Sequence, residues 1–419
     1  MNDIHINDKE RVLLLGCQLP YIDDEHFQYS MEELSSLTKT ANGEVVMVVT
    51  QKRDKVHSAT YIGKGKVEEL ITLEEELEFD VIIVNDELSP SQNRNLSSML
   101  NARVIDRTQL ILDIFAQRAR SKEGKLQVEL AQLQYLLPRL GGKGIELSRL
   151  GGGIGTRGPG ETKLESDRRH INRRIDDIKR QLQNIVKHRG QYRERRKRNQ
   201  VYQIALVGYT NAGKSTIFNR LTEANTFEEN LLFATLDPTT RQLTLSNGYQ
   251  ALLTDTVGFI QDLPTSLVAA FRSTLEEVVE ADFILHVVDS SDPDYMNHQK
   301  TVHSLLNELG VKDVPSLTVY NKKDRMPDSF IPSTNEESIV ISALNKEDQL
   351  LLVRKIEEVM KQKMEPYNIS LPSDSGKLLA ALKKETILEK TTFNEVKEAY
   401  ECKGFYFKDS RLSETIEKL

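Results

Sequence analysis

One short stretch constrains this chain more than any other. Apolar residues at 201–207 lead into the pattern Gly208-x-x-x-x-Gly213-Lys214-Ser215, and helix-forming residues follow. A strand, a glycine-rich turn and a helix in this order and spacing are typical of a phosphate-binding loop. The alternative is a turn that merely links a strand to a helix, and such a turn does not require this spacing.

The chemistry of a triphosphate explains the pattern. Backbone N–H groups have to point inward at the phosphates with a helix N-terminus behind them, and small, turn-tolerant residues allow this. We expect Lys214 to reach the β- and γ-phosphates and the hydroxyl of Ser215 to ligate Mg²⁺. The residues expected to bind phosphate are Gly208, Tyr209, Thr210, Asn211, Ala212, Gly213, Lys214 and Ser215.

The segment after this loop has the features of a nucleotide-sensing switch. Residues 233–240 show little helix or strand signal and contain three threonines. A threonine hydroxyl at such a place completes the Mg²⁺ shell only when a γ-phosphate is present. We expect Thr235 to do this, with Thr239 as the second choice. The nucleotide contacts expected in this segment are Phe233, Ala234, Thr235, Leu236 and Asp237.

A second switch follows an expected β-hairpin. Strand-forming residues at 241–245 and 249–254 flank an Asn-Gly pair at 247–248, which favours a tight turn. We expect Asp255, at the end of the second strand, to hold Mg²⁺ through water, and the N–H of Gly258 to sense the γ-phosphate. The nucleotide contacts expected here are Asp255, Thr256, Val257 and Gly258.

A later motif predicts which base is bound. A strand-forming run at 316–320 leads directly into Asn-Lys-Lys-Asp, and a strand at 338–341 ends in Ser-Ala-Leu. The carboxylate of Asp324 can accept both N1–H and the 2-amino group of guanine, whereas adenine offers neither donor. Guanine is therefore favoured, and an ATP-driven machine is disfavoured. The residues expected to form the base site are Asn321, Lys322, Lys323, Asp324, Ser342, Ala343 and Leu344.

Composition restricts the compartment and the number of domains. The chain has 419 residues, which is too long for one core and suggests about three domains. Cys17 and Cys402 are far apart and lack metal-ligand spacing, so neither a disulfide framework nor a zinc site is indicated. The N-terminus does not look like a signal peptide, and no apolar run approaches the roughly 18 residues of a membrane span. We expect a cytoplasmic monomer without membrane insertion.

The charge is unevenly distributed, and this indicates a partner. The net charge is −7, yet residues 141–198 contain 17 Lys and Arg against 7 Asp and Glu, which leaves −17 on the rest. Leucines and isoleucines spaced by three and four in 126–140 and 164–185 predict two helices of an antiparallel hairpin, with Pro138 kinking or ending the first. The loop between them, at 141–160, holds nine of the 22 glycines.

A basic helical rod with a glycine-rich tip suits structured RNA, because RNA duplexes are recognised mainly by shape and phosphate. A flexible linker is the alternative, but a linker has no need to be both glycine-dense and cationic. The residues expected to contact RNA are Lys143, Arg149, Arg157, Arg168, Arg169, Arg173 and Arg174.

These patterns predict an α/β chain of four segments. Residues 1–107 are expected to form a small N-terminal α/β domain, in which the Gly-Lys-Gly-Lys at 63–66 is a structural turn rather than a phosphate site. Residues 108–199 are expected to form the helical hairpin, and 200–365 a doubly wound phosphate-loop GTPase domain. Residues 366–419 are expected to form a small C-terminal α+β domain, with prolines at 366 and 372 bracketing a break.

The motifs together carry a family resemblance. The phosphate-binding loop, the Asp255 motif and the Asn321 motif resemble translation-factor-related GTPases, and residues 151–165, 208–215, 233–241 and 255–260 narrow this to the HflX family, over roughly residues 10–365. The resemblance implies a GTPase that binds the large ribosomal subunit and ribosomal RNA. It also implies that the protein separates stalled or idle ribosomes into subunits during stress, with the hairpin directed at the peptidyl-transferase centre.

One residue departs from the pattern of the small signalling GTPases. Those enzymes place a water-orienting glutamine where this chain has Phe259, which can neither donate nor accept a hydrogen bond. Unaided hydrolysis is therefore expected to be slow, and a group supplied in trans is worth about 10³ to 10⁵ in rate. In related GTPases an asparagine at the position of Asn211 helps to bind K⁺, so we expect K⁺ as a second cofactor beside Mg²⁺.

Two functions fit these patterns. In the first, GTP orders the two switches and favours a conformation whose hairpin engages the large subunit, and hydrolysis to GDP permits release. In the second, the chain is a ribosome-assembly or RNA-binding checkpoint GTPase that splits nothing.

Overall fold

The computed structural model describes residues 9–140, 159–199, 201–222, 232–261, 275, 277–311, 314–333 and 337–419. The chain forms two compact units. The first contains the described residues up to 185 together with Leu232, Phe233 and Gln261. The second contains the described residues from 186 onward, apart from those three.

A parallel sheet forms the centre of the first unit. Its strands follow the order β2-β1-β3-β4 and pair in parallel throughout. Strands alternate with helices along this part of the chain, as expected for an α/β domain. The strands are β1 (Arg11–Gln18), β2 (Glu44–Lys52), β3 (Val81–Val84) and β4 (Arg103–Asp106).

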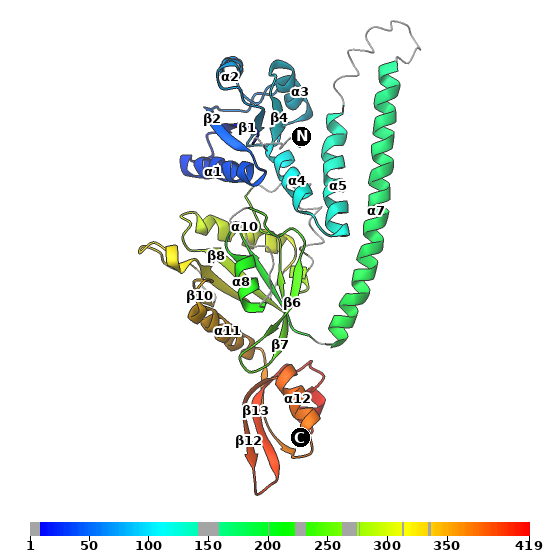
Figure 1. The fold of residues 1–419 in the computed structure, drawn as a ribbon, viewed down its shortest axis with the longest axis vertical. Coiled ribbons are helices and arrows are strands. Elements are labelled where there is room, and N and C mark those ends of the chain that lie inside the picture. The colour runs from blue at the N-terminus through cyan, green and yellow to red at the C-terminus, as the bar shows by residue number, and fades with distance from the viewer. Residues whose placement is uncertain are drawn as a thin grey trace, which may run out of the picture. The chain divides into compact units, whose positions relative to one another are not determined.

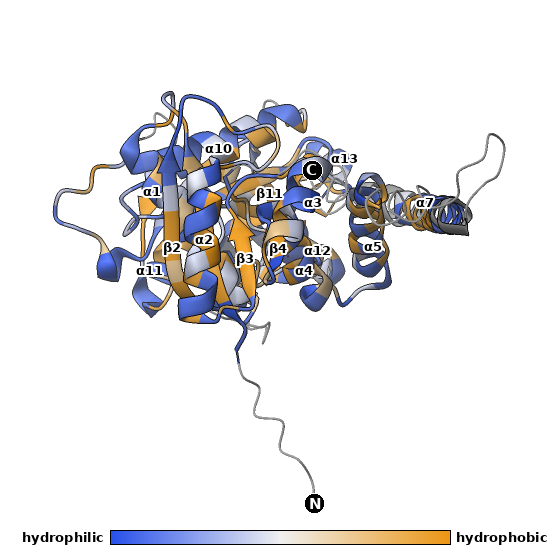
Figure 2. Ribbon diagram, turned by 90° about the horizontal axis from the view of Figure 1, so that it is seen from above, coloured by the Kyte–Doolittle hydropathy of each residue, from blue (hydrophilic) through white to orange (hydrophobic). Residues whose placement is uncertain are grey.

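Helices connect these strands and begin at residues that satisfy their free N–H groups. Asp23 caps α1, and Ser89 forms a capping box with Gln92 at the start of α3. Every residue of β3 is buried, and Figure 2 shows that strand as hydrophobic beside the amphipathic α2. The helices are α1 (Asp24–Thr40), α2 (Lys64–Leu77), α3 (Pro90–Met99) and α4 (Arg107–Arg118).

The predicted helical hairpin is present. Helix α5 (Lys122–Leu136) ends in a 3₁₀ turn at Leu137–Arg139, as Pro138 requires. Helix α7 (Pro159–Asn199) runs beside α5 (Figure 1) and, at 1.5 Å per residue, extends for about 60 Å. The guanidinium of Arg174 on α7 donates to both carboxylate oxygens of Glu129 on α5, at 2.6 and 2.8 Å.

A six-stranded sheet forms the centre of the second unit, in the order β10-β9-β8-β5-β7-β6. All neighbours are parallel except β6 and β7, which form the hairpin predicted around Gly248. Helices α8 (Lys214–Thr222), α10 (Tyr295–Glu308) and α11 (Lys346–Lys361) belong to this unit. The strands are β5 (Gln203–Gly208), β6 (Thr239–Thr244), β7 (Gln250–Asp255), β8 (Phe283–Asp289), β9 (Ser316–Asn321) and β10 (Ser338–Val340).

The C-terminal residues form a small α+β lobe in this unit, and one expectation about it is wrong. Pro366 and Pro372 do not bracket a break, because strand β11 (Glu365–Pro372) contains both. It is an edge strand in the order β11-β13-β12, and an edge strand tolerates prolines. The other elements of the lobe are α12 (Gly376–Glu385), β12 (Ile387–Asn394), β13 (Ala399–Tyr406) and α13 (Ser413–Glu417).

This lobe shares a hydrophobic core with the six-stranded sheet. Ile387, Phe405 and Phe407 pack into the same cluster as Tyr202 and Tyr249 at the starts of β5 and β7. Within the described residues, no helix combines the length and the apolar character needed to cross a membrane.

Candidate nucleotide-binding site

The predicted phosphate-binding loop lies between the end of β5 and the start of α8. Gly208 has φ of +153° and Gly213 has φ of +94°, which side chains rarely allow. A Cβ at Gly208 would overlap the carbonyl oxygen of Val287 on the neighbouring strand, and one at Gly213 would overlap Nδ2 of Asn321. Glycine is therefore required at both positions by backbone conformation and by close approach.

Lys214 points back along this loop. Its ammonium donates to the carbonyl oxygens of Gly208 at 3.0 Å and of Tyr209 at 2.7 Å. Burial lowers the pKa of Lys214 to about 8, and the negative charge of Asp255 opposes the shift. A phosphate chain in the loop would oppose it further, because a nearby negative charge favours the ammonium form.

Three side chains from separate elements meet beside the loop. The hydroxyls of Ser215 and Thr235 lie 2.9 Å apart, and each donates at 2.8 Å to Oδ2 of Asp255. Oδ1 of Asp255 is buried without a hydrogen-bond partner among the described residues, and burial raises the pKa of this carboxyl despite the opposing charge of Lys214. Two hydroxyls and a buried carboxylate are hard oxygen donors, which fit a divalent cation such as Mg²⁺. Thr239, the second choice, lies on β6 opposite Asp255 in the strand register.

The segment after Asp255 pairs directly with the phosphate-binding loop. The N–H of Thr210 donates to the carbonyl oxygen of Phe259 at 2.8 Å, and the N–H of Phe259 donates to that of Gly208 at 3.2 Å. A Cβ added at Gly258 would lie 2.9 Å from Cα of Thr210 and 3.0 Å from Nζ of Lys214. The structure therefore brings Gly258 next to Lys214, which was expected to reach the γ-phosphate.

Asn321 ties the base motif to the phosphate-binding loop. Its Nδ2 donates to the carbonyl oxygen of Ala212 at 3.0 Å, and its Oδ1 accepts from the N–H of Ala343 at 2.9 Å. The side chain is 3% exposed. One amide thus connects three segments that are each predicted to contact the nucleotide.

The other base-motif residues have defined partners as well. Oδ1 of Asp324 accepts from the hydroxyl of Ser342 at 2.6 Å, and this hydrogen bond lowers the pKa of the Asp324 carboxyl. Lys322 has φ of 65° and its ammonium donates at 2.6 Å to Oδ2 of Asp289. Lys323 lies 3.6 Å from a carboxylate oxygen of Asp348.

The first switch segment is divided between the two units. Thr235 belongs to the second unit with Ala234, buried Leu236 and Asp237, whereas Phe233 belongs to the first. The ring of Phe233 is buried and meets that of Phe115 edge-on, with centroids 4.6 Å apart.

Two further hydrogen bonds hold switch-flanking residues within the first unit. The N–H of Leu232 donates to the hydroxyl of Thr40 at 3.3 Å. The guanidinium of Arg107 donates to the carbonyl oxygen of Gln261 at 3.4 Å, and the same group forms a buried ion pair with Glu33. Gln261 follows Gly258 by three residues in the sequence, so both switches have flanking residues in this unit.

The expected RNA contacts are described only in part. Lys143, Arg149 and Arg157 lie outside the described residues. Of the four arginines on α7, Arg168, Arg169 and Arg173 are exposed and Arg174 is half-buried in its ion pair with Glu129; Arg169 pairs with Glu165 one turn away.

Two residues near the phosphate-binding loop were not predicted from the sequence. Asp289 ends β8 and orients Lys322, and a carboxylate at the end of a parallel strand is a signal that could have identified it. His298 on α10 stacks on Tyr209 with ring centroids 3.7 Å apart and an interplanar angle of 9°. No sequence signal links His298 to a loop almost 90 residues earlier.

Comparison with known proteins gives matches over most of the chain. Three family models match in succession: "GTP-binding GTPase N-terminal" at residues 28–116, "GTP-binding GTPase Middle Region" at 118–196 and "50S ribosome-binding GTPase" at 203–322. A GTP-binding protein from the archaeon Sulfolobus solfataricus, solved in complex with GDP, is 26% identical with a TM-score of 0.45, and the match covers 84% of this chain and 99% of that one.

Curated relatives match over most of the chain. GTPase HflX of Alkalihalophilus pseudofirmus is 60% identical over 404 residues, covering 96% of this chain and 95% of the relative. GTPase HflX of Escherichia coli is 40% identical over 381 residues, covering 90% and 89%. The chain therefore belongs to the HflX family of GTPases and is a GTP hydrolase.

Proposed function

We propose that this GTPase binds the large ribosomal subunit through its helical hairpin and dissociates stalled or idle ribosomes into subunits. The observation that carries the proposal is helix α7, whose exposed Arg168 and Arg173 lie on the same chain as a complete guanine-nucleotide motif set. The family model described as a ribosome-binding GTPase supports the same partner. The hairpin with its tip loop would contact ribosomal RNA, including through Lys143, Arg149 and Arg157.

GTP and Mg²⁺ would occupy the site described above. Ser215 and Thr235 would ligate the ion and Asp255 would hold it through water, because their oxygens already converge within 3 Å of one another. Bound Mg²⁺ neutralises the charge that develops on the phosphates. The nucleotide contacts are the residues predicted in the four motifs, from Gly208 to Leu344.

The two switches would transmit the nucleotide state to the hairpin. Leu232, Phe233 and Gln261, which flank the switches in the sequence, pack in the same unit as α5 and most of α7. A γ-phosphate that draws in Thr235 and Gly258 therefore changes the backbone next to these packed residues. We place this coupling in a cytoplasmic, ribosome-associated monomer, with the GTPase domain at 200–365 between an N-terminal region and a small C-terminal domain.

Purified large subunits are expected to accelerate GTP turnover strongly, because Phe259 supplies no water-orienting group and the missing group has to come from a partner. The measurement is phosphate release with and without subunits across a range of salt concentrations. Absence of acceleration at every salt concentration would contradict ribosome binding.

The double variant Arg168→Gln/Arg173→Gln is expected to weaken subunit binding and to lower its salt slope by about 0.7 to 0.9 for each phosphate that the variant no longer neutralises. Lys363→Gln/Lys390→Gln, which removes two exposed lysines near the C-terminus, is the matched control.

Light scattering of intact ribosomes separates splitting from the assembly-checkpoint alternative. Splitting predicts a fall in scattering when the protein and a non-hydrolysable GTP analogue are added. A checkpoint GTPase leaves the scattering unchanged even while its turnover responds to large subunits.

Potassium is expected to accelerate GTP hydrolysis relative to sodium at equal ionic strength. Asn211 has φ of 60° and is exposed at the start of the glycine-rich turn, where its side chain can reach an ion beside the phosphates. The variant Asn211→Ala is expected to remove the difference between the two salts. Equal wild-type turnover in both salts would exclude a potassium role.

A further inference from the structure

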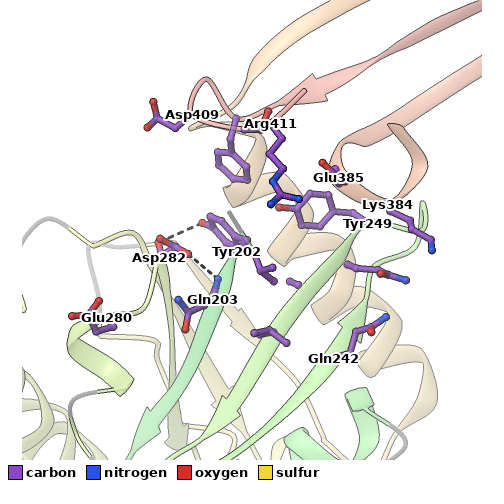
Figure 3. Close-up of a pocket in the computed structure, with 16 residues that line it drawn as sticks. Tyr202, Gln203, Gln242, Tyr249, Glu280, Asp282, Lys384, Glu385, Asp409 and Arg411 are labelled. Carbon is purple, nitrogen blue, oxygen red and sulfur yellow. Dashed lines mark hydrogen bonds between the residues drawn. The ribbon is translucent and has the colours of Figure 1, made fainter. Parts of the chain in front are cut away.

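A cavity lies at the amino ends of the central strands of the six-stranded sheet, at the opposite end of these strands from the nucleotide site. Its volume is about 660 Å³, and it lies where β5 and β7 begin, against residues 384–385, 407 and 409–411 of the C-terminal lobe (Figure 3). The phosphate-binding loop and Asp255 lie at the carboxyl ends of these same strands. None of the residues assigned to GTP lines this cavity.

Aromatic rings give the cavity a rigid wall. Tyr202 and Phe407 stack with centroids 4.7 Å apart and an interplanar angle of 13°. Tyr202 and Tyr249 are 8% and 4% exposed, and both belong to the shared hydrophobic core. These two rings are held by packing, and the partly buried ring of Phe407 supplies the accessible aromatic surface of the wall.

Carboxylates outnumber cations around this wall. Four acidic side chains line the cavity against two basic ones, Lys384 and Arg411. Burial is the main reason why the pKa of both tyrosines is raised, and the negative charge of Asp282 raises it further. For Tyr249 the negative charge of Glu385 adds to this effect. An anionic ligand would be repelled. The four acidic residues are Glu280, Asp282, Glu385 and Asp409.

A guanidinium from the chain itself already extends into this cavity. Figure 3 shows the side chain of Arg411 directed from the C-terminal lobe toward Tyr249. Arg411 is otherwise an exposed residue near the C-terminus. Its side chain is therefore one of those that line the cavity.

We propose that this cavity binds an arginine side chain presented by a partner protein, which takes the place that Arg411 now enters. A guanidinium is planar, stacks on aromatic faces and pairs with carboxylates through a fork of N–H groups. Its aliphatic stem covers apolar surface at the entrance. A free polyamine shares the positive charge but lacks the planar fork.

The test is fluorescence anisotropy of a labelled Gly-Arg-Gly peptide titrated with the full chain. The same peptide with citrulline, which has nearly the same shape without the charge, is expected to bind about tenfold more weakly, as the loss of a cation–π interaction and an ion pair requires. Equal binding of the two peptides, or binding of neither, would overturn the proposal. If spermidine displaces the labelled peptide at concentrations where an unlabelled arginine peptide does not, the cavity is a polyamine site and the arginine proposal is wrong.

Charge variants then locate the binding. Glu385→Gln and Asp409→Asn are each expected to weaken the arginine peptide by about threefold, whereas Glu395→Gln, an exposed glutamate outside the cavity, is the matched control with no effect. Arg411→Gln is expected to tighten the peptide several-fold because it removes the internal competitor. A loss of affinity in Arg411→Gln would indicate an anion site and would exclude the arginine model. All four positions are at the surface, so thermal unfolding serves as the check that folding is retained.

Discussion

Asp324→Asn is expected to exchange a preference for guanine for a preference for xanthine. In the wild-type chain the hydroxyl of Ser342 donates to Oδ1 of Asp324 and lowers the pKa of that carboxyl, so the hydrogen bond favours the carboxylate form. An ionised carboxylate accepts from both N1–H and the 2-amino group of guanine. An asparagine amide loses one of these hydrogen bonds and instead donates to the 2-carbonyl oxygen of xanthine.

The expected loss for guanine is large because both hydrogen bonds involve a charged acceptor. The bond that is lost is worth about 1.5 to 3 kcal/mol, and the remaining bond weakens by about 1 kcal/mol because its acceptor becomes neutral, so GDP affinity is expected to fall by roughly a hundredfold or more. Calorimetric titration with GDP, XDP and ADP measures the change directly. Asp328→Asn, the same charge change at an exposed residue four positions away, is the control and should bind GDP normally. Unchanged GDP affinity in Asp324→Asn, or ADP that competes as well as GDP in the wild type, would contradict the assignment.

Gly213→Ala is expected to abolish nucleotide binding and to destabilise the second unit. The residue has φ of +94°, and the added Cβ would overlap Nδ2 of Asn321. Asn321 cannot move freely, because it donates to Ala212 and accepts from the N–H of Ala343. The backbone strain costs about 1 to 3 kcal/mol, and each broken hydrogen bond about 1 kcal/mol more.

Thermal unfolding with and without GDP measures both consequences. GDP raises the midpoint of the wild-type chain because it binds only the folded state, and the variant is expected to unfold earlier and to show no shift. Gly65→Ala is the matched control. Among the described residues, nothing lies within 4 Å of a Cβ at that position in the first turn of α2, so the stability there is expected to be unchanged or slightly higher. If GDP raises the unfolding midpoint of Gly213→Ala as much as that of the wild type, the Asn321 side chain can move away from the added Cβ without loss of binding, and the prediction is wrong.

Local patterns were sufficient for the elements that position the site. The strands β5, β7 and β9 were predicted because each is an apolar run ending in a polar motif, and such a signal depends only on neighbouring residues. The hairpin helices followed from leucines and isoleucines at a helical period, and Pro138 set the end of α5. The Pro366–Pro372 segment misled the same reasoning, because two prolines look like a break unless the strand is known to be at an edge.

The sequence by itself determined the order of the motifs, and with it the family, the phosphate-binding loop and the base-reading carboxylate. Only the tertiary structure decided that Ser215, Thr235 and Asp255 meet within 3 Å, that Asn321 joins three segments, and that switch-flanking residues pack in the first unit. The tertiary structure also revealed the cavity lined by Tyr202 and Tyr249 at the starts of β5 and β7. The physical reason is that spacing along the chain reports contacts within one helix or strand, whereas these sites join residues from separate elements, and only the packing of the core brings them together.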